Sequence, residues 1–193
     1  MILAWAVVLG LLVAWARYRG EIADHLASLS LTGVWLVPLA LLLQLPLLRS
    51  GTGPIEPLRT AQILFLASQG FLLLFVGLNR GSAGIRLFGL GLLANLLVIG
   101  LNSGFMPITP DTLAAINPGS RVEQWIPGLH YGGSKDIILP RGETVLWLLS
   151  DILILPPPFP WTAAFSVGDL LIGAGIVWFL QTPGTDRDTV GGG

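Results

Sequence analysis

The chain has 193 residues, of which 53% are hydrophobic and only 11% are charged. A soluble domain carries about a quarter charged residues, and the mean hydropathy here is +0.77, so the sequence predicts an all-α membrane protein. The net charge of −1 argues against nucleic acid as a partner, and the absence of cysteine excludes disulfides, thiolate metal ligands and cysteine nucleophiles.

Five apolar stretches predict about five transmembrane helices, since about 20 apolar residues in a helix cross the hydrocarbon core of a bilayer. The first stretch begins at Met1 with no positive segment before it, so we expect an uncleaved helix rather than a signal peptide. Pro38 lies inside the second stretch and should bend that helix, because proline removes a backbone donor. The predicted helices span residues 1–16, 26–48, 58–78, 85–101 and 167–181.

A long segment between the fourth and fifth helices holds nine of the fourteen prolines and is predicted to form a cap. Thr109 followed by Pro110 has the order of an N-cap and a first helical residue, which predicts a short helix over 110–116. Residues 144–155 are mostly apolar but too few to span, so we expect an interfacial or re-entrant helix. The chain thus divides into a four-helix region (1–101), the cap (102–165), the last helix (166–181) and a polar tail (182–193).

The distribution of arginine in short connections and the tail predicts the orientation of the chain. One side holds five of these residues and the other holds two, and the richer side is expected to be cytoplasmic. The N-terminus and the cap should then lie outside a bacterial inner membrane, with the C-terminus in the cytoplasm. The five are Arg17, Arg19, Arg80, Arg86 and Arg187, and the two are Arg49 and Arg59.

Four amide side chains in or next to the predicted spans need hydrogen-bond partners. Gln62 and Gln69 are seven residues apart on the third helix, and Asn95 and Asn102 have the same spacing on the fourth. We expect Gln69–Asn95 and Gln62–Asn102 hydrogen bonds in an antiparallel hairpin. The pairs would either hold the helices together or line a substrate path. Two glycines on the same face of the fourth helix would allow a close approach, namely Gly84 and Gly91.

Two aspartates are expected to lie near the ends of helices or in the cap. Ser166 and Asp169 have the spacing of a capping box, which predicts the start of the last helix; a ligand or proton-linked role for Asp169 is the alternative. Asp151 lies among apolar residues and is expected to pair with Lys135 or Arg141.

A candidate outer-face site comprises His130, Lys135, Asp136 and Asp151. Their spacing lacks the i, i+4 histidine pattern of a zinc helix, so no metal site is predicted. Because neither His130 nor His25 lies inside a predicted span, we expect no centrally bound haem or chlorophyll. No cofactor is predicted, although the apolar surface suits contact with lipid or pigment.

Several short motifs resemble a family of bacterial multi-pass membrane proteins of unknown function. Asn-Ser-Gly-Phe-Met-Pro at 102–107 follows the fourth helix, and Ser-Val-Gly-Asp at 166–169 enters the last one. The resemblance implies a helix bundle with an outer cap, and it brings no activity or ligand with it. Further matching segments are 17–20, 133–135 and 150–156 with the prolines through Pro160.

Three functions remain open from the sequence. The leading expectation is a non-catalytic accessory or structural subunit of a larger membrane complex, with bioenergetic and photosynthetic complexes as candidates. Its partners would be lipids and other membrane subunits. The alternatives are a small transporter or channel that uses the amide stripe, and a membrane enzyme acting on a lipid through Asp151 and Asp169.

Overall fold

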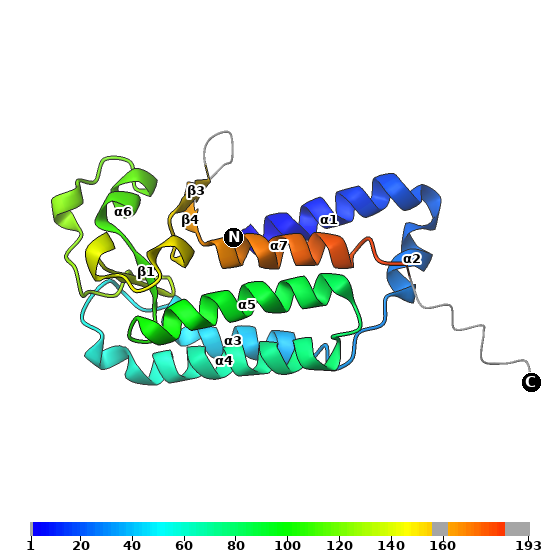
Figure 1. Cartoon of the computed structure of the whole chain (residues 1–193), viewed down its shortest axis with the longest axis horizontal. Helices are drawn as coiled ribbons and strands as arrows, with labels where there is room; N and C mark the ends of the chain where they lie inside the picture. Colours follow the sequence, from blue (N-terminus) through cyan, green and yellow to red (C-terminus); the bar gives the residue numbers. More distant parts are fainter. Residues whose placement is uncertain (1, 156–161, 184–193) are drawn as a thin grey trace, which may run out of the picture.

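Apolar helices lie side by side in the computed structural model, with a cap of short elements at one end (Figure 1). The structure describes residues 2–155 and 162–183, without the side chains of residues 2 and 3; the predicted motif at 156–160 and most of the predicted tail lie outside these ranges. The long helices are α1 (Ile2–Tyr18), α3 (Leu36–Leu48), α4 (Arg59–Leu78), α5 (Ala83–Leu101) and α7 (Val167–Phe179).

The remaining elements are short. Two helices of seven residues are α2 (Ile22–Ser28) and α6 (Pro110–Ile116). The strands are β1 (Met106–Ile108), β2 (Asp136–Ile138), β3 (Leu153–Leu155) and β4 (Ala163–Phe165), and the 3-10 turns are Arg19–Glu21, Glu56–Leu58, Val122–Gln124, Arg141–Glu143 and Trp147–Leu149. The fold is therefore mostly helical, and the expectation of an all-α protein is corrected by two small sheets in the cap.

The second predicted helix is broken into α2 and α3. Gly33 has a φ of +69°, a left-handed conformation that ends helical structure and favours glycine. The Asn79 side chain holds this break by accepting a hydrogen bond from the Thr32 amide and donating one to its carbonyl, both at 2.8 Å. Pro38 consequently lies in the first turn of α3, where its missing amide hydrogen interrupts no helical bond, so the predicted bend is wrong.

Two helical segments are long and apolar enough to cross a membrane, Glu56–Leu78 and Ala83–Leu101. By contrast, α3 and α7 have 13 residues each. At 1.5 Å per residue each is about 20 Å long, which is less than the roughly 30 Å of a hydrocarbon core. Helix lengths therefore do not support the prediction of about five spans.

Glycine brings α5 and α7 into backbone contact. A Cβ atom added to Gly91 would lie 2.4 Å from the Gly168 carbonyl oxygen, and one added to Gly84 would lie 2.7 Å from the Gly175 carbonyl oxygen. The close partner of the glycine face of α5 is thus α7, not α4 as predicted. The other close neighbours are α3 with α4 and α1 with α7.

The cap packs over the end of the bundle where α5 ends and α7 begins (Figure 1). Strands β1 and β2 pair in parallel, and β3 and β4 pair antiparallel. The predicted helix α6 is present, with the Thr109 hydroxyl accepting a hydrogen bond from the Thr112 amide at 3.1 Å. The predicted helix over 144–155 is wrong. Leu146 has a φ of +55°, only Trp147–Leu149 form a helical turn, and Leu153–Leu155 pair with β4 instead.

Candidate functional site

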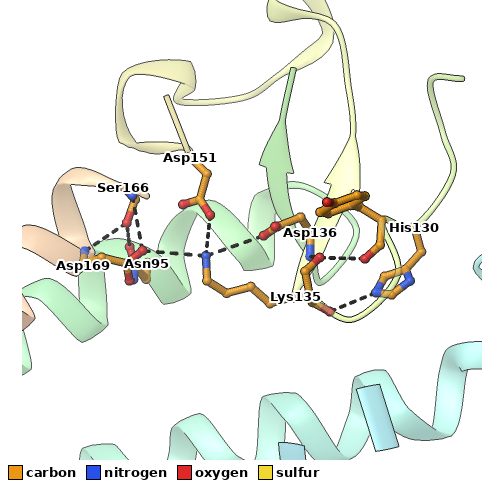
Figure 2. A network of polar contacts seen from close by, with 9 residues as sticks. Asn95, His130, Lys135, Asp136, Asp151, Ser166 and Asp169 are labelled. Atoms are coloured by element: carbon orange, nitrogen blue, oxygen red, sulfur yellow. Dashed lines mark hydrogen bonds and ion pairs between the residues drawn. The ribbon is translucent and has the colours of Figure 1, made fainter. Parts of the chain in front are cut away.

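The ammonium group of Lys135 lies among three carboxylates where the cap meets the bundle (Figure 2). Its Nζ donates a hydrogen bond to Asp151 Oδ2 at 2.7 Å. It also lies 3.6 Å from Asp136 Oδ1 and 3.8 Å from Asp169 Oδ2. We refer to Lys135, Asp136, Asp151 and Asp169 as the aspartate cluster. Three carboxylates around one ammonium leave two negative charges uncompensated when all are ionised.

Backbone pairing in the cap brings the cluster together. The Lys135 carbonyl accepts a hydrogen bond from the Met106 amide at 2.9 Å, and Asp136 is the first residue of β2 beside β1. The Asp151 amide donates to the Pro107 carbonyl at 3.1 Å, which places Asp151 next to the same strand. Strand β1 therefore aligns three of the four residues, and α7 supplies the fourth.

Asp169 is held by a capping box and by α5. Its amide donates to Ser166 Oγ at 3.0 Å, and its Oδ2 accepts from the Ser166 amide at 3.2 Å. Asn95 Nδ2 donates to Asp169 Oδ1 at 2.7 Å, and Ser166 Oγ donates to Asn95 Oδ1 at 2.7 Å (Figure 2). The predicted helix cap is confirmed, and it also orients the carboxylate toward Lys135.

Burial and charge act on the cluster in opposite directions. Burial by itself would lower the pKa of Lys135, but the carboxylates of Asp151, Asp169 and Asp136 raise it above its ordinary value. Burial raises the pKa of Asp151 to about 8, and the two neighbouring carboxylates add to this effect against the opposing ammonium. The cluster therefore stabilises positive charge and resists complete ionisation of its acids.

Two oxygen atoms of the cluster lack hydrogen-bond donors within the described part of the chain. Asp136 Oδ1 and Asp151 Oδ1 are buried and make no hydrogen bond. The residues are 7% and 3% exposed, respectively. A buried carboxylate oxygen without a donor is unfavourable, so both atoms have unused capacity to accept a hydrogen bond.

An open cavity of about 660 Å³ reaches the cluster, and all four of its residues contribute to the lining. The remaining wall is largely apolar and includes Leu41 and Leu48 of α3 and Ala4 of α1. These three residues are exposed, so the cavity opens at the side of the bundle between α1 and α3. Leu41 and Leu48 are seven residues apart, which extends the apolar wall about 10 Å along α3.

The structure places three of the four predicted outer-face residues in the cluster and leaves His130 out. The His130 ring is fully buried, and its Nε2 and Nδ1 atoms contact the carbonyls of Ser134 and Gly51 at 3.0 and 3.4 Å. His130 therefore fastens the loop before Lys135 to the chain after α3. In the described ranges, no three or more His, Cys, Asp or Glu side chains are arranged so that they could hold a metal ion. The three cluster aspartates instead converge on the Lys135 ammonium.

The predicted amide pairs are not formed. Gln69 donates to Ser68 Oγ at 3.1 Å, and Asn95 is bonded to residues at the start of α7. Gln62 donates to the Ser103 carbonyl. Asn102 donates to the Val98 and Val145 carbonyls and accepts from the Val145 amide, so it ties the cap to α5. The seven-residue spacing predicted that these side chains share one face of a helix. It did not predict which helix packs against that face.

Sequence reasoning missed the link from Asn95 to Asp169 and the presence of Asp169 in the cluster. A signal for it was present, because Gly168 and Gly175 on α7 repeat the spacing of Gly84 and Gly91 on α5. Matching small residues at equal spacing allow two helices to approach closely. That match predicts the α5–α7 pair, which brings Asn95 next to the start of α7.

Comparison with known proteins gives one match. The model of a family of unknown function (DUF5317) matches residues 28–181, about four fifths of the chain. No curated protein and no solved structure matches. The expectation of an uncharacterised family is confirmed, and the chain belongs to the DUF5317 family.

Proposed function

We propose that this protein is a non-catalytic, multi-pass membrane protein that binds an amphiphilic molecule in the cavity between cap and bundle. The observation that carries the proposal is the combination of an apolar wall and a charged end in one cavity. Cavities of about 300–1,000 Å³ with mostly apolar walls and a few polar groups are typical ligand sites. An acyl chain would lie along α3, and a polar head group would reach the aspartate cluster.

The alternatives have less support. A transporter or channel was expected to use a polar path lined by four amides. These amides have separate partners and do not form such a path: Gln62, Gln69, Asn95 and Asn102. An enzyme acting on a lipid gains from finding Asp151 and Asp169 on one cavity. However, two aspartates held by a lysine provide neither an activated nucleophile nor a phosphate site. Binding without chemistry accounts for the same geometry with fewer assumptions.

The proposed topology places the cap outside the inner membrane of a bacterium and the loop between α4 and α5 in the cytoplasm. It includes five membrane-embedded helices, with the short α3 and α7 supplemented by their flanking turns. Because the native chain has no cysteine, single cysteines report sidedness directly. A cysteine replacing Glu143 in the cap should react with a membrane-impermeant maleimide in intact cells, and one replacing Gly81 should react only after lysis. The reverse pattern would contradict the topology.

Ligand binding is tested by blocking the cavity. Leu41 and Leu42 are neighbours on α3 with similar exposure, 54% and 61%, but only Leu41 lines the cavity. Leu41→Trp should reduce the amount of diacyl phospholipid retained by the protein in native mass spectrometry from mild detergent by roughly tenfold, a loss of about 1.4 kcal/mol. Leu42→Trp should retain as much lipid as the wild type. Equal retention by both variants would contradict the proposal.

The role as an accessory subunit is the second part of the proposal. Such a subunit would present the amphiphile bound at its cap to a neighbouring membrane protein. Purification in mild detergent should then recover a complex with defined partners. Recovery of only a lipid-binding monomer would indicate a free-standing binding protein and would contradict the subunit role.

A further inference from the structure

We infer that the head group bound by the aspartate cluster is a protonated primary amine, as carried by an aminophospholipid. The inference rests on the proposed function, because it concerns the polar end of the same cavity. Its basis is the imbalance of the cluster in charge and in hydrogen-bond donors.

The donor count is the first argument. The Lys135 ammonium makes its hydrogen bond to Asp151 Oδ2 and lies too far from Asp136 Oδ1 to make another there. Asp136 Oδ1 and, when Asp151 is ionised, Asp151 Oδ1 remain buried acceptors without donors. Both residues line the cavity, so a head group at its polar end lies next to residues that have unused acceptor capacity for N–H or O–H groups. A primary ammonium supplies three such donors from one atom.

Charge is the second argument. The ion pairs of the cluster in the described ranges are all made by Lys135, which faces three carboxylates. With all three acids ionised, an added cation would offset one of the two uncompensated negative charges, whereas an anionic head group would add to the negative excess. A quaternary ammonium would supply the charge but no donor, and a sugar would supply donors but no charge. Of these head groups, only a protonated amine satisfies both requirements.

The test uses a series of ligands with identical acyl chains and needs no change in the protein. Binding of phosphatidylethanolamine, its N-methyl and N,N-dimethyl derivatives, and phosphatidylcholine to the wild type is measured by native mass spectrometry. Affinity should fall as methyl groups replace N–H donors. The total loss should be roughly ten- to hundredfold, as expected for hydrogen bonds to charged groups. Phosphatidylglycerol should bind as weakly as phosphatidylcholine, and a neutral galactolipid should bind less tightly than phosphatidylethanolamine.

Variants locate the effect at the cluster. Asp136→Asn and Asp151→Asn should each reduce the preference for phosphatidylethanolamine over phosphatidylcholine to less than about threefold, because each removes one charged acceptor. Asp111→Asn changes an exposed acid of the cap and should keep the full preference. Helical circular dichroism verifies the fold of each variant, and the methylation series on the wild type stands if one fails to fold.

The outcomes separate the two proposals. If the wild type retains no lipid, the proposed function fails. If it retains all of these lipids equally, or prefers the galactolipid or phosphatidylglycerol, the cavity binds lipid but the amine assignment is wrong. A graded loss along the methylation series, removed by Asp136→Asn, supports both.

Discussion

Two groups of largely buried polar side chains differ in charge and in how fully their hydrogen bonds are satisfied. Inside the bundle, Gln44 and Gln69 both donate to Ser68 Oγ at 3.1 Å, and Ser68 donates to the Phe65 carbonyl. This group is neutral and joins α3 to α4. The aspartate cluster instead holds excess negative charge and has two acceptors without donors. Helix packing explains the bundle group, whereas the proposed ligand would explain the cluster.

Removal of the Lys135 ammonium should have the largest effect on the stability of the protein. Lys135→Met leaves three carboxylates next to one another without a cation, and loss of one member of a buried ion pair destabilises a protein by about 3–5 kcal/mol. The apparent unfolding temperature in detergent should fall markedly. The matched control is Arg141→Met, which removes an exposed cap cation stacked on Trp147 and should cost about 1 kcal/mol or less. Equal effects of the two variants would contradict a central role for the cluster.

The stability of the protein should depend on pH because Asp151 of the cluster is buried. Because the pKa of Asp151 is about 8 in the folded protein and about 4 in an unfolded chain, the folded state retains a proton that the unfolded state releases between these values. Stability is therefore expected to be greatest at low pH in this window and to decrease as pH rises from 4 to 8. Lys135 stays charged throughout, since its pKa is raised.

Thermal unfolding across pH 4–8 measures this dependence. Asp151→Asn should remove most of the slope. A wild-type unfolding temperature that increases with pH would show that the carboxylates are fully ionised and stabilised by Lys135.

A smaller effect is expected at the glycine contact of α5 and α7. Gly91→Ala places a methyl group 2.4 Å from the Gly168 carbonyl oxygen, so the helices must separate at a cost of about 1–3 kcal/mol. Gly100 lies on the same helix with nothing within 4 Å of an added Cβ atom. Gly100→Ala should be neutral or stabilising by about 0.5–1 kcal/mol, because alanine favours helix. Thermal unfolding of the two variants measures the difference. A larger loss of stability for Gly100→Ala than for Gly91→Ala would contradict a close α5–α7 contact at Gly91.

The smallest expected effect is the coupling energy of the predicted pair Gln69–Asn95. Asn95→Leu should destabilise the protein by about 1–3 kcal/mol, because Asp169 Oδ1 loses its donor and the Ser166 hydroxyl loses its acceptor. Gln69→Leu removes one bond to Ser68 and should cost about 1 kcal/mol or less. Since the two side chains have separate partners, the effects should add in a double-mutant cycle. A coupling energy above about 0.5 kcal/mol would restore the predicted Gln69–Asn95 contact.

Local features were predictable from the sequence, and relations between distant segments were mostly not. Hydropathy placed α4 and α5 within two residues of their observed starts, and capping residues located α6 and α7. The break before α3 depends on Asn79, about fifty residues away from Thr32, so local propensity could not reveal it. The Lys135–Asp151 pair was one of two predicted options.

The parts of the site that were missed arise from packing. Asp169 joins the cluster because α5 and α7 approach through glycine, and the prediction had paired α5 with α4. The cavity combines side chains of α1, α3 and α4 with those of the cap, which no single segment encodes. Residues 144–155 were assigned to a helix because their composition is apolar, but Leu146 has a left-handed φ and Leu153–Leu155 pair with β4.

An experimental structure of the protein grown from a lipidic mesophase doped with phosphatidylethanolamine tests the central claim most directly. We expect elongated density along Leu41 and Leu48, with its polar end within hydrogen-bond distance of Asp136 Oδ1 and Asp151 Oδ1. A cavity closed by side chains, or Lys135 turned away from the three aspartates, would contradict the account.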